Sequence, residues 1–334
     1  MLFRLMAAVA LAAAMIVPGK ASAEANVVRV AKQFGVAYMQ YMVMQELKLI
    51  EKHAKAAGLD VTTEWATFRS SDVMNDALIS GSVDFVSLGI PGIITIWSKT
   101  KGTAVEVKGV AGLNVSPLML MVRDPAIKSI KDFKDNHRIA MPAVKVSMQA
   151  IMLQMAAAKE FGDAKFGALD HLTVSMAHPD AVIALLAGST GISAHFSSPP
   201  FHQRERMDPR VRTILTSDDV MGGSTTFTMI STTSKFRQEN PQVFAAVLKA
   251  LEEANRMIVA DKKMAADLLV ATEGGGLSPE EILEVLNDPH VKFTTTPENV
   301  MKYAEFMNDA GSLKNRPASW KDLFFPEIHG APGS

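Results

Sequence analysis

Two segments far apart in the chain repeat one local pattern. Ala77–Ser82 reads as a helix end followed by the apolar run Val83–Leu88, and Ala184–Ser189 similarly precedes the apolar run Ile192–Phe196. In each segment a glycine follows the last helical residues, where it supplies the left-handed turn that ends a helix. The repeat predicts two similar α/β lobes that face each other. The cleft between such lobes is the first place to look for a functional site.

The first 23 residues are predicted to be a secretory signal peptide. Arg4 gives a positive start, Leu5–Val17 is apolar, and Ala21-Ser22-Ala23 has the small residues of a cleavage site. The apolar run is too short to span a bilayer, and no later segment of the sequence is long and apolar enough to do so. We therefore expect an exported, periplasmic chain that is cleaved near Ala23.

Composition narrows the possible functions. The chain has no cysteine, which excludes thiol nucleophiles, thiolate metal sites and a lipid-anchored cysteine. Its formal net charge is −1 with well-mixed charges, which argues against binding to nucleic acid or to an anionic membrane. The sequence has no Gly-x-Ser-x-Gly elbow, no phosphate-binding loop and no histidine pair at metal-ligand spacing. We therefore favour binding over catalysis and expect no cofactor and no metal.

The mature sequence alternates between strand and helix patterns, which is typical of mostly parallel sheets flanked by helices. In the first half we expect strands at Val27–Ala31, Leu59–Trp65, Val83–Leu88, Val105–Leu113 and Leu118–Val122, with helices at Tyr38–Ala57, from Ser70 or Ser71 to Gly81, and after Pro91. A second set has strands at Arg138–Met141, Leu172–Val174, Ile192–His195, Val211–Leu215 and Thr226–Ser231, with helices at Ser129–Phe133, Ser147–Phe161, Pro179–Ala187 and after Pro199-Pro200. The rest is helical, at Pro241–Val259, Lys262–Ala271, from Ser278 through Leu286, and from Thr296-Pro297 to near Gly311.

The joins between the two sets are apolar strands rather than a polar linker. We expect one lobe to contain residues 24–119 and 229–334, and the other residues 120–228. Strands at Leu118–Val122 and Thr226–Ser231 would then cross between the lobes. Two crossing strands form a hinge that bends without becoming a flexible linker.

Ligands of open parallel sheets bind at the carboxyl ends of strands, where loops and helix N-termini present backbone N–H groups. Applied to this chain, the rule selects these candidate ligand-binding residues: Phe34, Gly35, Val36, Tyr38, Phe68, Arg69, Gly89, Ile90, Pro91, Asn114, Val144, Lys145, Ser147, His195, Phe196 and Ser197. Each also has a structural interpretation. Gly35 would be only a turn, Arg69 and Lys145 solvent-exposed cations, Ser147 a helix N-cap, and His195 a satisfied buried histidine.

The order of several motifs resembles the exported solute-binding proteins of ABC importers, in the branch that serves sulfonates, nitrate, taurine and thiamine-type pyrimidines. The resemblance rests on Ala77-Leu78-x-x-Gly81-x-Val83-Asp84-Phe85 followed by Gly89-x-Pro91, on Ser129–Lys134, on Pro179-Asp180-Ala181-x-x-Ala184-Leu185, and on Asn240-Pro241. Two positions depart from the family pattern: Ala143–Ser147 replaces a glycine-serine turn, and Ser193 replaces an acidic residue.

The resemblance implies a two-lobe periplasmic binding protein, a monomer that binds a small molecule in its cleft and presents it to a permease and ATPase. A small organic anion of the sulfonate, taurine, nitrate or carboxylate class is the first expectation. A neutral or aromatic ring such as a pyrimidine is the alternative. Two further readings stay open: a sensor that presents the ligand to a membrane receptor, and a pyrimidine-synthase-like enzyme using Lys145 and His195.

Overall fold

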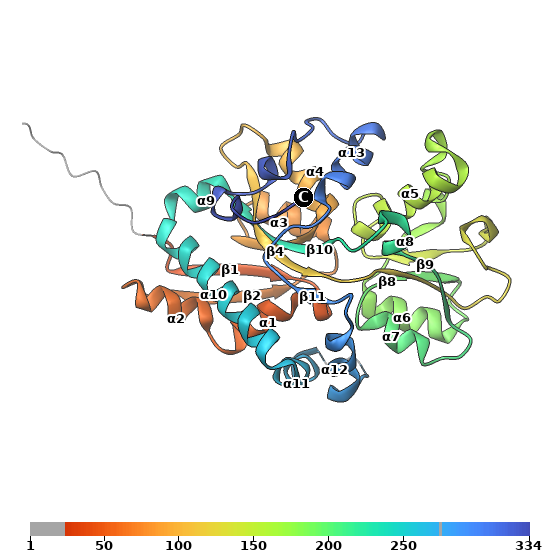
Figure 1. Cartoon of the computed structure of the whole chain (residues 1–334), viewed down its shortest axis with the longest axis horizontal. Helices are drawn as coiled ribbons and strands as arrows, with labels where there is room; N and C mark the ends of the chain where they lie inside the picture. Colours follow the sequence, from red (N-terminus) through yellow and green to blue (C-terminus); the bar gives the residue numbers. More distant parts are fainter. Residues whose placement is uncertain (1–23, 274–275) are drawn as a thin grey trace, which may run out of the picture.

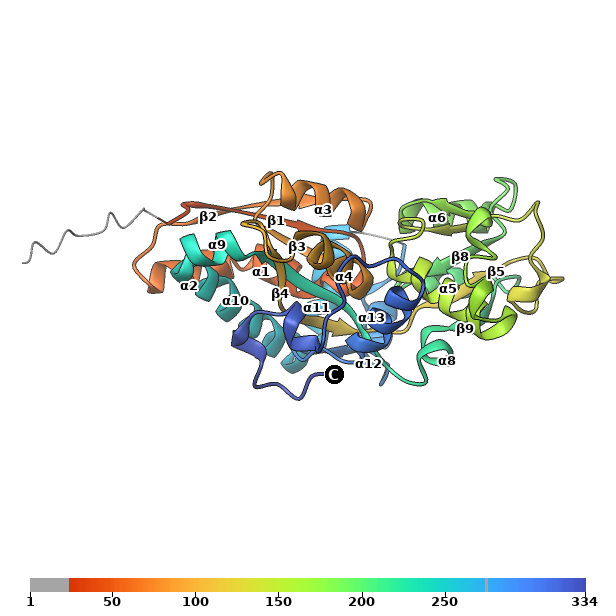
Figure 2. The ribbon, with the colours of Figure 1, turned by 90° about the horizontal axis from the view of Figure 1, so that it is seen from above.

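The computed structural model describes residues 24–273 and 276–334, and its elements form two sheets that lie side by side along the long axis (Figures 1 and 2). The predicted signal peptide, residues 1–23, lies outside the described residues. We call the six-stranded sheet with its helices the first lobe and the five-stranded sheet with its helices the second lobe. In the described part of the chain, no helix is both long and apolar enough to cross a membrane.

The first lobe is built on a mixed sheet in the order β11-β4-β10-β3-β1-β2. Its strands are β1 (Val27–Lys32), β2 (Thr62–Thr67), β3 (Phe85–Gly89), β4 (Val107–Val115), β10 (Thr226–Thr233) and β11 (Lys292–Phe293). Strands β1, β2 and β3 are parallel, as their helical connections require, whereas β10 runs antiparallel to both β3 and β4. The mixed sheet confirms the expected α/β class.

The second lobe contains a smaller sheet in the order β7-β6-β8-β5-β9. Its strands are β5 (Met119–Val122), β6 (Ile139–Met141), β7 (Thr173–Ser175), β8 (Ala194–Ser197) and β9 (Arg212–Thr216). Strand β6 is parallel to β7 and β8, and β5 is antiparallel to β8 and β9. The chain therefore passes between the sheets twice, from β4 to β5 and again before β10.

Helices cover both sheets. Those of the first lobe are α1 (Met39–Glu46), α2 (Leu49–Ala56), α3 (Ser71–Ile79), α4 (Ile90–Thr100), α9 (Ser234–Glu239), α10 (Pro241–Ala260), α11 (Lys262–Glu273), α12 (Pro279–Asn287) and α13 (Val300–Asp309). Those of the second are α5 (Met148–Phe161), α6 (His178–Ala187), α7 (Phe201–Arg206) and α8 (Ser217–Met221). Short 3₁₀ helices lie at Val36–Tyr38, Ile130–Asp132, Asp163–Lys165, Asp170–Leu172, Trp320–Leu323 and Pro326–Ile328.

Local turn chemistry behaves as predicted at several helix ends. Gly81 and Gly188 adopt positive φ angles of 74° and 68° after α3 and α6. Ser278 forms the capping box of α12 with Glu281, and Pro279 occupies its first turn. These features use only neighbouring residues, so the sequence alone identifies them.

The predicted helix Tyr38–Ala57 is wrong, because the chain breaks into α1 and α2 at Lys48, which has a φ of 49°. Leu47, directly before the break, is 43% exposed although it is apolar. Helix α1 is buried on nearly every side, from Met39 to Met44. Helix α2 buries only one stripe. The break lets α2 adopt its own orientation relative to α1, so that its apolar stripe faces the core.

The last predicted helix begins later than expected, at Val300 instead of Thr296-Pro297. The intervening residues are engaged elsewhere: Glu298 N donates to Thr226 Oγ1 at 2.8 Å, and Thr226 N donates to the Glu298 carbonyl. Strand β11 was not predicted either, because a two-residue strand carries no periodic signal.

Candidate ligand-binding site

A cavity lies where the two lobes meet. Its walls include Gln33, Phe34, Tyr38, Ser71, Gly89, Pro142, Ser147, Met148, Gln149, His178, Ser198, Phe227 and Thr228. The first lobe contributes the loop after β1, the N-terminus of α3 and the facing ends of β3 and β10. The second lobe contributes the N-termini of α5 and α6 and the loop after β8. With a volume of ≈ 20 Å³ the cavity has room for about one water molecule, so the lobes are closed on each other.

Direct contacts between the lobes explain why the cavity is small. Val36 N donates to the Pro199 carbonyl at 3.3 Å. A Cβ added at Gly35 would lie 2.8 Å from that same oxygen, and one added at Gly89 would lie 3.3 Å from the Met148 Cβ. Glycine at both positions therefore permits the close approach of the two lobes.

Helix α11 of the first lobe orders the loop after β1. Glu273 Oε2 accepts a hydrogen bond from Gly35 N at 2.7 Å, and its other oxygen lies 3.4 Å from Lys32 Nζ. Burial raises the pKa of the Glu273 carboxyl above its ordinary value, and the Lys32 ammonium opposes that rise. This glutamate therefore sits at the helix start where an anionic ligand was expected.

The second lobe presents the start of α5. Ser147 is its N-cap: the hydroxyl accepts from Ala150 N at 3.2 Å and donates to the Ala143 carbonyl at 2.6 Å. Both interactions are structural, yet Ser147 also lines the cavity. Two residues later, Gln149 projects from the first turn and is only 2% exposed. The positive end of the α5 dipole therefore points toward the cavity.

Behind Gln149 runs a buried row of polar side chains. Gln149 Nε2 lies 3.2 Å from His178 Nε2, and His178 Nδ1 lies 2.7 Å from His195 Nε2. His195 Nδ1 is 2.5 Å from Glu205 Oε1. His195 and Glu205 are both 0% exposed. The row joins α5, α6, β8 and α7 and ends at the cavity.

The lining is nearly free of formal charge. Among the described residues that form it, none is an arginine or a lysine, and the titratable side chains are Tyr38 and His178. Burial raises the pKa of the Tyr38 phenol, with Glu273 adding to the rise. Burial lowers the pKa of His178 well below its usual value, and His195 and His202 reinforce that effect. Both groups therefore favour their neutral forms.

The predicted candidates of the first lobe divide into four groups. Phe34, Tyr38 and Gly89 line the cavity, while Gly35 and Val36 touch Pro199 beside it. Ile90, Pro91 and Asn114 are buried; the Asn114 amide donates to the Ala37 carbonyl and to Thr228. Phe68 is half-buried and Arg69 is exposed, and neither lines the cavity.

Of the second-lobe candidates, Ser147 alone lines the cavity. Lys145 is exposed, and Val144 is half-buried beside it. The other three candidates lie on β8 and are completely buried: His195 within the polar row, Phe196 in the hydrophobic core, and Ser197. Lys145 and His195 therefore do not share a pocket.

Sequence reasoning did not single out Gln149, His178, Phe227, Thr228 or Glu273. His178 carried a usable signal, because it directly precedes Pro179 at a helix start and so lies at the end of a loop in the second lobe. Glu273 carried none, since α11 is far from the loop after β1 in sequence.

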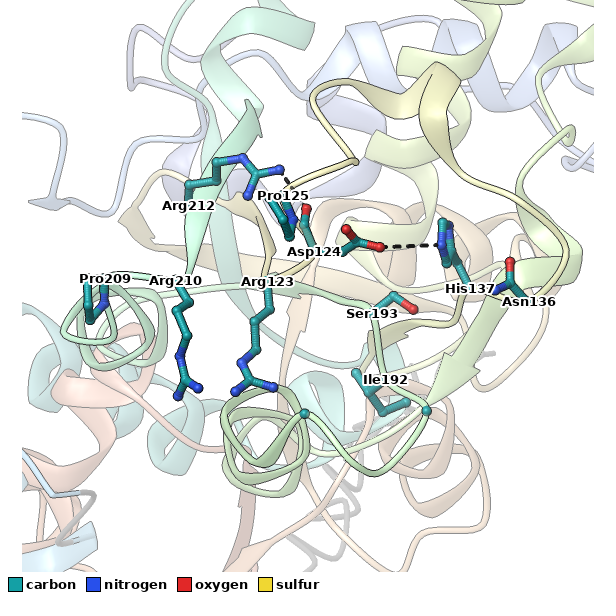
Figure 3. A pocket seen from close by; sticks show the side chains of 12 residues that line it. Arg123, Asp124, Pro125, Asn136, His137, Ile192, Ser193, Pro209, Arg210 and Arg212 are labelled. Carbon is teal, nitrogen blue, oxygen red and sulfur yellow. Dashed lines mark hydrogen bonds and ion pairs between the residues drawn. The ribbon is translucent and has the colours of Figure 1, made fainter.

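A larger depression of ≈ 730 Å³ lies on the second lobe alone (Figure 3). Its basic side chains are largely occupied: Arg210 pairs with Asp208, and Arg212 donates to backbone carbonyls. The Arg123 guanidinium fills space that only a glycine at position 188 leaves free. The first lobe contributes no described residue to its lining, so this depression is not part of the site between the lobes.

Two α/β lobes joined by two crossings, with a cavity between them, define the periplasmic-binding-protein fold. Residues 21–272 match the model of the NMT1-like family, and the chain belongs to this family. A search of the curated proteins gave no significant match.

Solved structures share this fold at low sequence identity. The alkanesulfonate-binding protein SsuA from Xanthomonas axonopodis pv. citri, bound to MOPS, has a TM-score of 0.68 at 17% identity, over 88% of this chain and 96% of that one. The aliphatic sulphonate binding protein SsuA from Escherichia coli has a TM-score of 0.64 at 19% identity, over 90% and 92%. The nitrate-binding protein NrtA from Synechocystis PCC 6803 has a TM-score of 0.65 at 16% identity, over 90% and 84%.

Proposed function

We propose that this chain is the periplasmic solute-binding component of an ABC importer. It captures a small organic anion of the sulfonate, taurine, nitrate or carboxylate class and delivers it to a membrane permease by hinge closure. The observation that carries the proposal is the cavity itself, whose polar and aromatic walls come from both lobes. A solute held there contacts both lobes and so stabilises their closed arrangement. Membership of the NMT1-like family and the sulfonate- and nitrate-binding structural relatives support this function.

The cavity can bind an anion through a helix dipole and through uncharged hydrogen-bond donors. The N-terminus of α5 points toward it, and Tyr38, Gln149 and Thr228 place polar groups around it. Backbone N–H groups at a helix start are a recurrent binding site for anions. These features favour a compact oxyanion head group.

A second ligand class is favoured by the aromatic part of the lining. Phe34, Tyr38 and Phe227 give the cavity an apolar side that suits a neutral or aromatic ring. The enzyme alternative has no comparable support, because Lys145 is exposed whereas His195 is completely buried.

We further propose that residues 1–23 direct export and that the second lobe moves as one body against the first. The second lobe corresponds to the expected residues 120–228, with Met119 of β5 added and Thr226–Thr228 of β10 assigned to the first lobe. The two passages between the sheets, from β4 to β5 and before β10, would act as the hinge. A sensor that presents the same ligand to a membrane receptor would use the same motion.

A thermal-shift screen of the purified chain from Glu24 onward tests the proposal. The panel contains ethanesulfonate, taurine, nitrate, benzoate and a neutral aminopyrimidine. A tight ligand at a thousandfold excess over its Kd raises the free energy of unfolding by about 4 kcal/mol. Stabilisation by an anion supports the first ligand class, and stabilisation by the pyrimidine alone supports the second. Chemical conversion of a bound compound would contradict the binding function.

A further inference from the structure

The row from Glu205 to the cavity contains three contacts, and each contact needs one hydrogen atom between its two partners. Glu205 meets His195, His195 meets His178, and His178 meets Gln149. All four side chains are at least nine-tenths buried. Their polar atoms must therefore form hydrogen bonds with one another rather than with bulk water. The placement of one proton therefore dictates the direction of its neighbours' hydrogen bonds.

Two arrangements that differ by one proton both place one hydrogen atom in every contact. In the first, Glu205 is ionised, both imidazoles are neutral with hydrogen on Nδ1, and the Gln149 amide N–H donates to His178 Nε2. The row then carries one negative charge. In the second, one proton has been added from solvent: His195 is an imidazolium paired with Glu205, and His178 carries its hydrogen on Nε2. His178 now donates to the Gln149 carbonyl oxygen, which requires the amide to turn over, because Nε2 faces His178 in the structure. The row is then neutral.

The two arrangements present different atoms to the cavity. With the added proton, the Gln149 carbonyl is engaged by His178, so the amide N–H groups are free to face a ligand. Without it, one of the two amide N–H groups is engaged by His178 and the carbonyl oxygen is free. An anion has only acceptor atoms at its head group. It is therefore favoured by the protonated row, which presents both amide N–H groups, and disfavoured by the unprotonated row, which presents the carbonyl oxygen.

The burial of Glu205 gives the added proton a large effect on the energy of the row. Glu205 is 0% exposed, and its Oε2 has no hydrogen-bond partner among the described residues. A buried carboxylate held at one oxygen is costly unless a positive group compensates it. Among the described residues, His195 is the side chain that bonds the Glu205 carboxylate, so a proton on His195 compensates that charge directly.

We propose that Gln149 and His178 determine specificity for anions, and that Glu205 and His195 are positioning residues that couple ligand binding to uptake of one proton. The inference rests on the proposed function and deepens it. Other titratable or charged groups on the elements around the row are His202, Arg204 and Arg206 on α7, exposed Asp180 on α6, and Tyr38 across the cavity. Phe201 stacks on His178 with ring centroids 5.3 Å apart and holds that imidazole in place.

Ring-nitrogen NMR of the ¹⁵N-histidine-labelled chain tests the row without any ligand. His178→Gln and His195→Gln provide the assignments. When the row takes up its proton, the hydrogen of His178 should move from Nδ1 to Nε2. A His178 tautomer that stays constant over the pH range in which the chain is folded would overturn the switch.

Calorimetry with ethanesulfonate tests the coupling, because a sulfonate stays ionised and any proton taken up belongs to the protein. The binding enthalpy, measured in buffers of different ionisation enthalpy, should report uptake approaching one proton at neutral pH. Affinity should fall about tenfold per pH unit above the transition. The neutral aminopyrimidine should show no uptake.

Glu205→Gln should abolish the uptake, whereas Glu239→Gln, which removes an exposed carboxylate elsewhere, should leave it intact. Binding of ethanesulfonate with no proton uptake would overturn this inference and leave the proposed function standing. Failure of every anion in the panel to bind would overturn the anion-binding function itself. If Glu205→Gln does not fold, the NMR titration of the unchanged chain decides the question.

Discussion

Gly35 of the first lobe packs against the backbone carbonyl of Pro199 in the second, so closely that a Cβ on Gly35 would lie 2.8 Å from the Pro199 oxygen. Gly35 also has φ 101° and ψ −179°, a backbone conformation that essentially only glycine adopts. The residue beside it, Val36, donates a hydrogen bond to the same oxygen. Contact with the Pro199 carbonyl therefore limits how closely the two lobes approach each other.

Gly35→Ala should therefore hold the lobes apart. The new methyl group collides with the Pro199 carbonyl, and the backbone conformation costs about 1–3 kcal/mol. Small-angle X-ray scattering should show a larger radius of gyration with a saturating panel ligand than the unchanged chain shows. Gly58→Ala is the matched control, since Gly58 also has a positive φ but nothing within 4 Å of its added Cβ. Equal radii for both variants would refute the prediction.

Ser147→Ala should lower the free energy of unfolding by about 1 kcal/mol, because the α5 N-terminus loses the side-chain acceptor of Ala150 N. Urea denaturation measures the change. Ser70→Ala offers a comparison, since Ser70 is the N-cap of α3 but its side chain makes no capping hydrogen bond. A loss at Ser70 as large as that at Ser147 would contradict the role assigned to the α5 cap.

Glu253→Gln should lower the free energy of unfolding by an amount that depends on pH. Glu253 on α10 bonds Lys52 Nζ at 2.6 Å and His53 Nε2 at 2.7 Å on α2, and these partners lower the pKa of the glutamate. A carboxyl whose folded pKa is lowered contributes stability above its unfolded pKa and loses it as pH falls through the folded pKa. We expect a loss of about 0.5–1 kcal/mol at pH 7 that shrinks toward zero under acidic conditions.

The measurement is urea denaturation of Glu253→Gln across the acidic range. Glu252→Gln, an equal charge change at the exposed neighbouring position, should show a smaller effect at every pH. If the loss of unfolding free energy in Glu253→Gln instead grows as pH falls, the ion pairs are not its cause.

Gly109→Ala should loosen the C-terminal segment from the first lobe. Phe325 N donates to the Gly109 carbonyl at 2.9 Å, and an added Cβ would lie 2.5 Å from the Phe324 ring. Overpacking of this kind costs about 1–3 kcal/mol. Thermal unfolding should show the loss, and limited proteolysis should cut the C-terminal segment sooner. Gly330→Ala, which meets no atom within 4 Å, should be close to neutral.

Several parts of this protein could be predicted because neighbouring residues decide them. The glycine turns at Gly81 and Gly188, the capping box at Ser278 and the N-cap at Ser147 need only local sequence. Alternating strand and helix patterns likewise predicted an α/β fold in two sets, which the two sheets confirm. The break at Lys48 was missed because the burial of α1 on all sides depends on what surrounds it.

Only the tertiary structure decided which of these local features meet at the cavity. Glu273 reaches Gly35, and Gln149, His178, His195 and Glu205 align, through elements that have no sequence relation to one another. Arg69 and Phe196 matched the strand-end rule equally well, yet one side chain is exposed and the other is in the core. Sequence patterns report whether a backbone continues or turns, because that depends on adjacent residues. A side chain's hydrogen-bond partners and its access to the cavity depend on packing between distant segments.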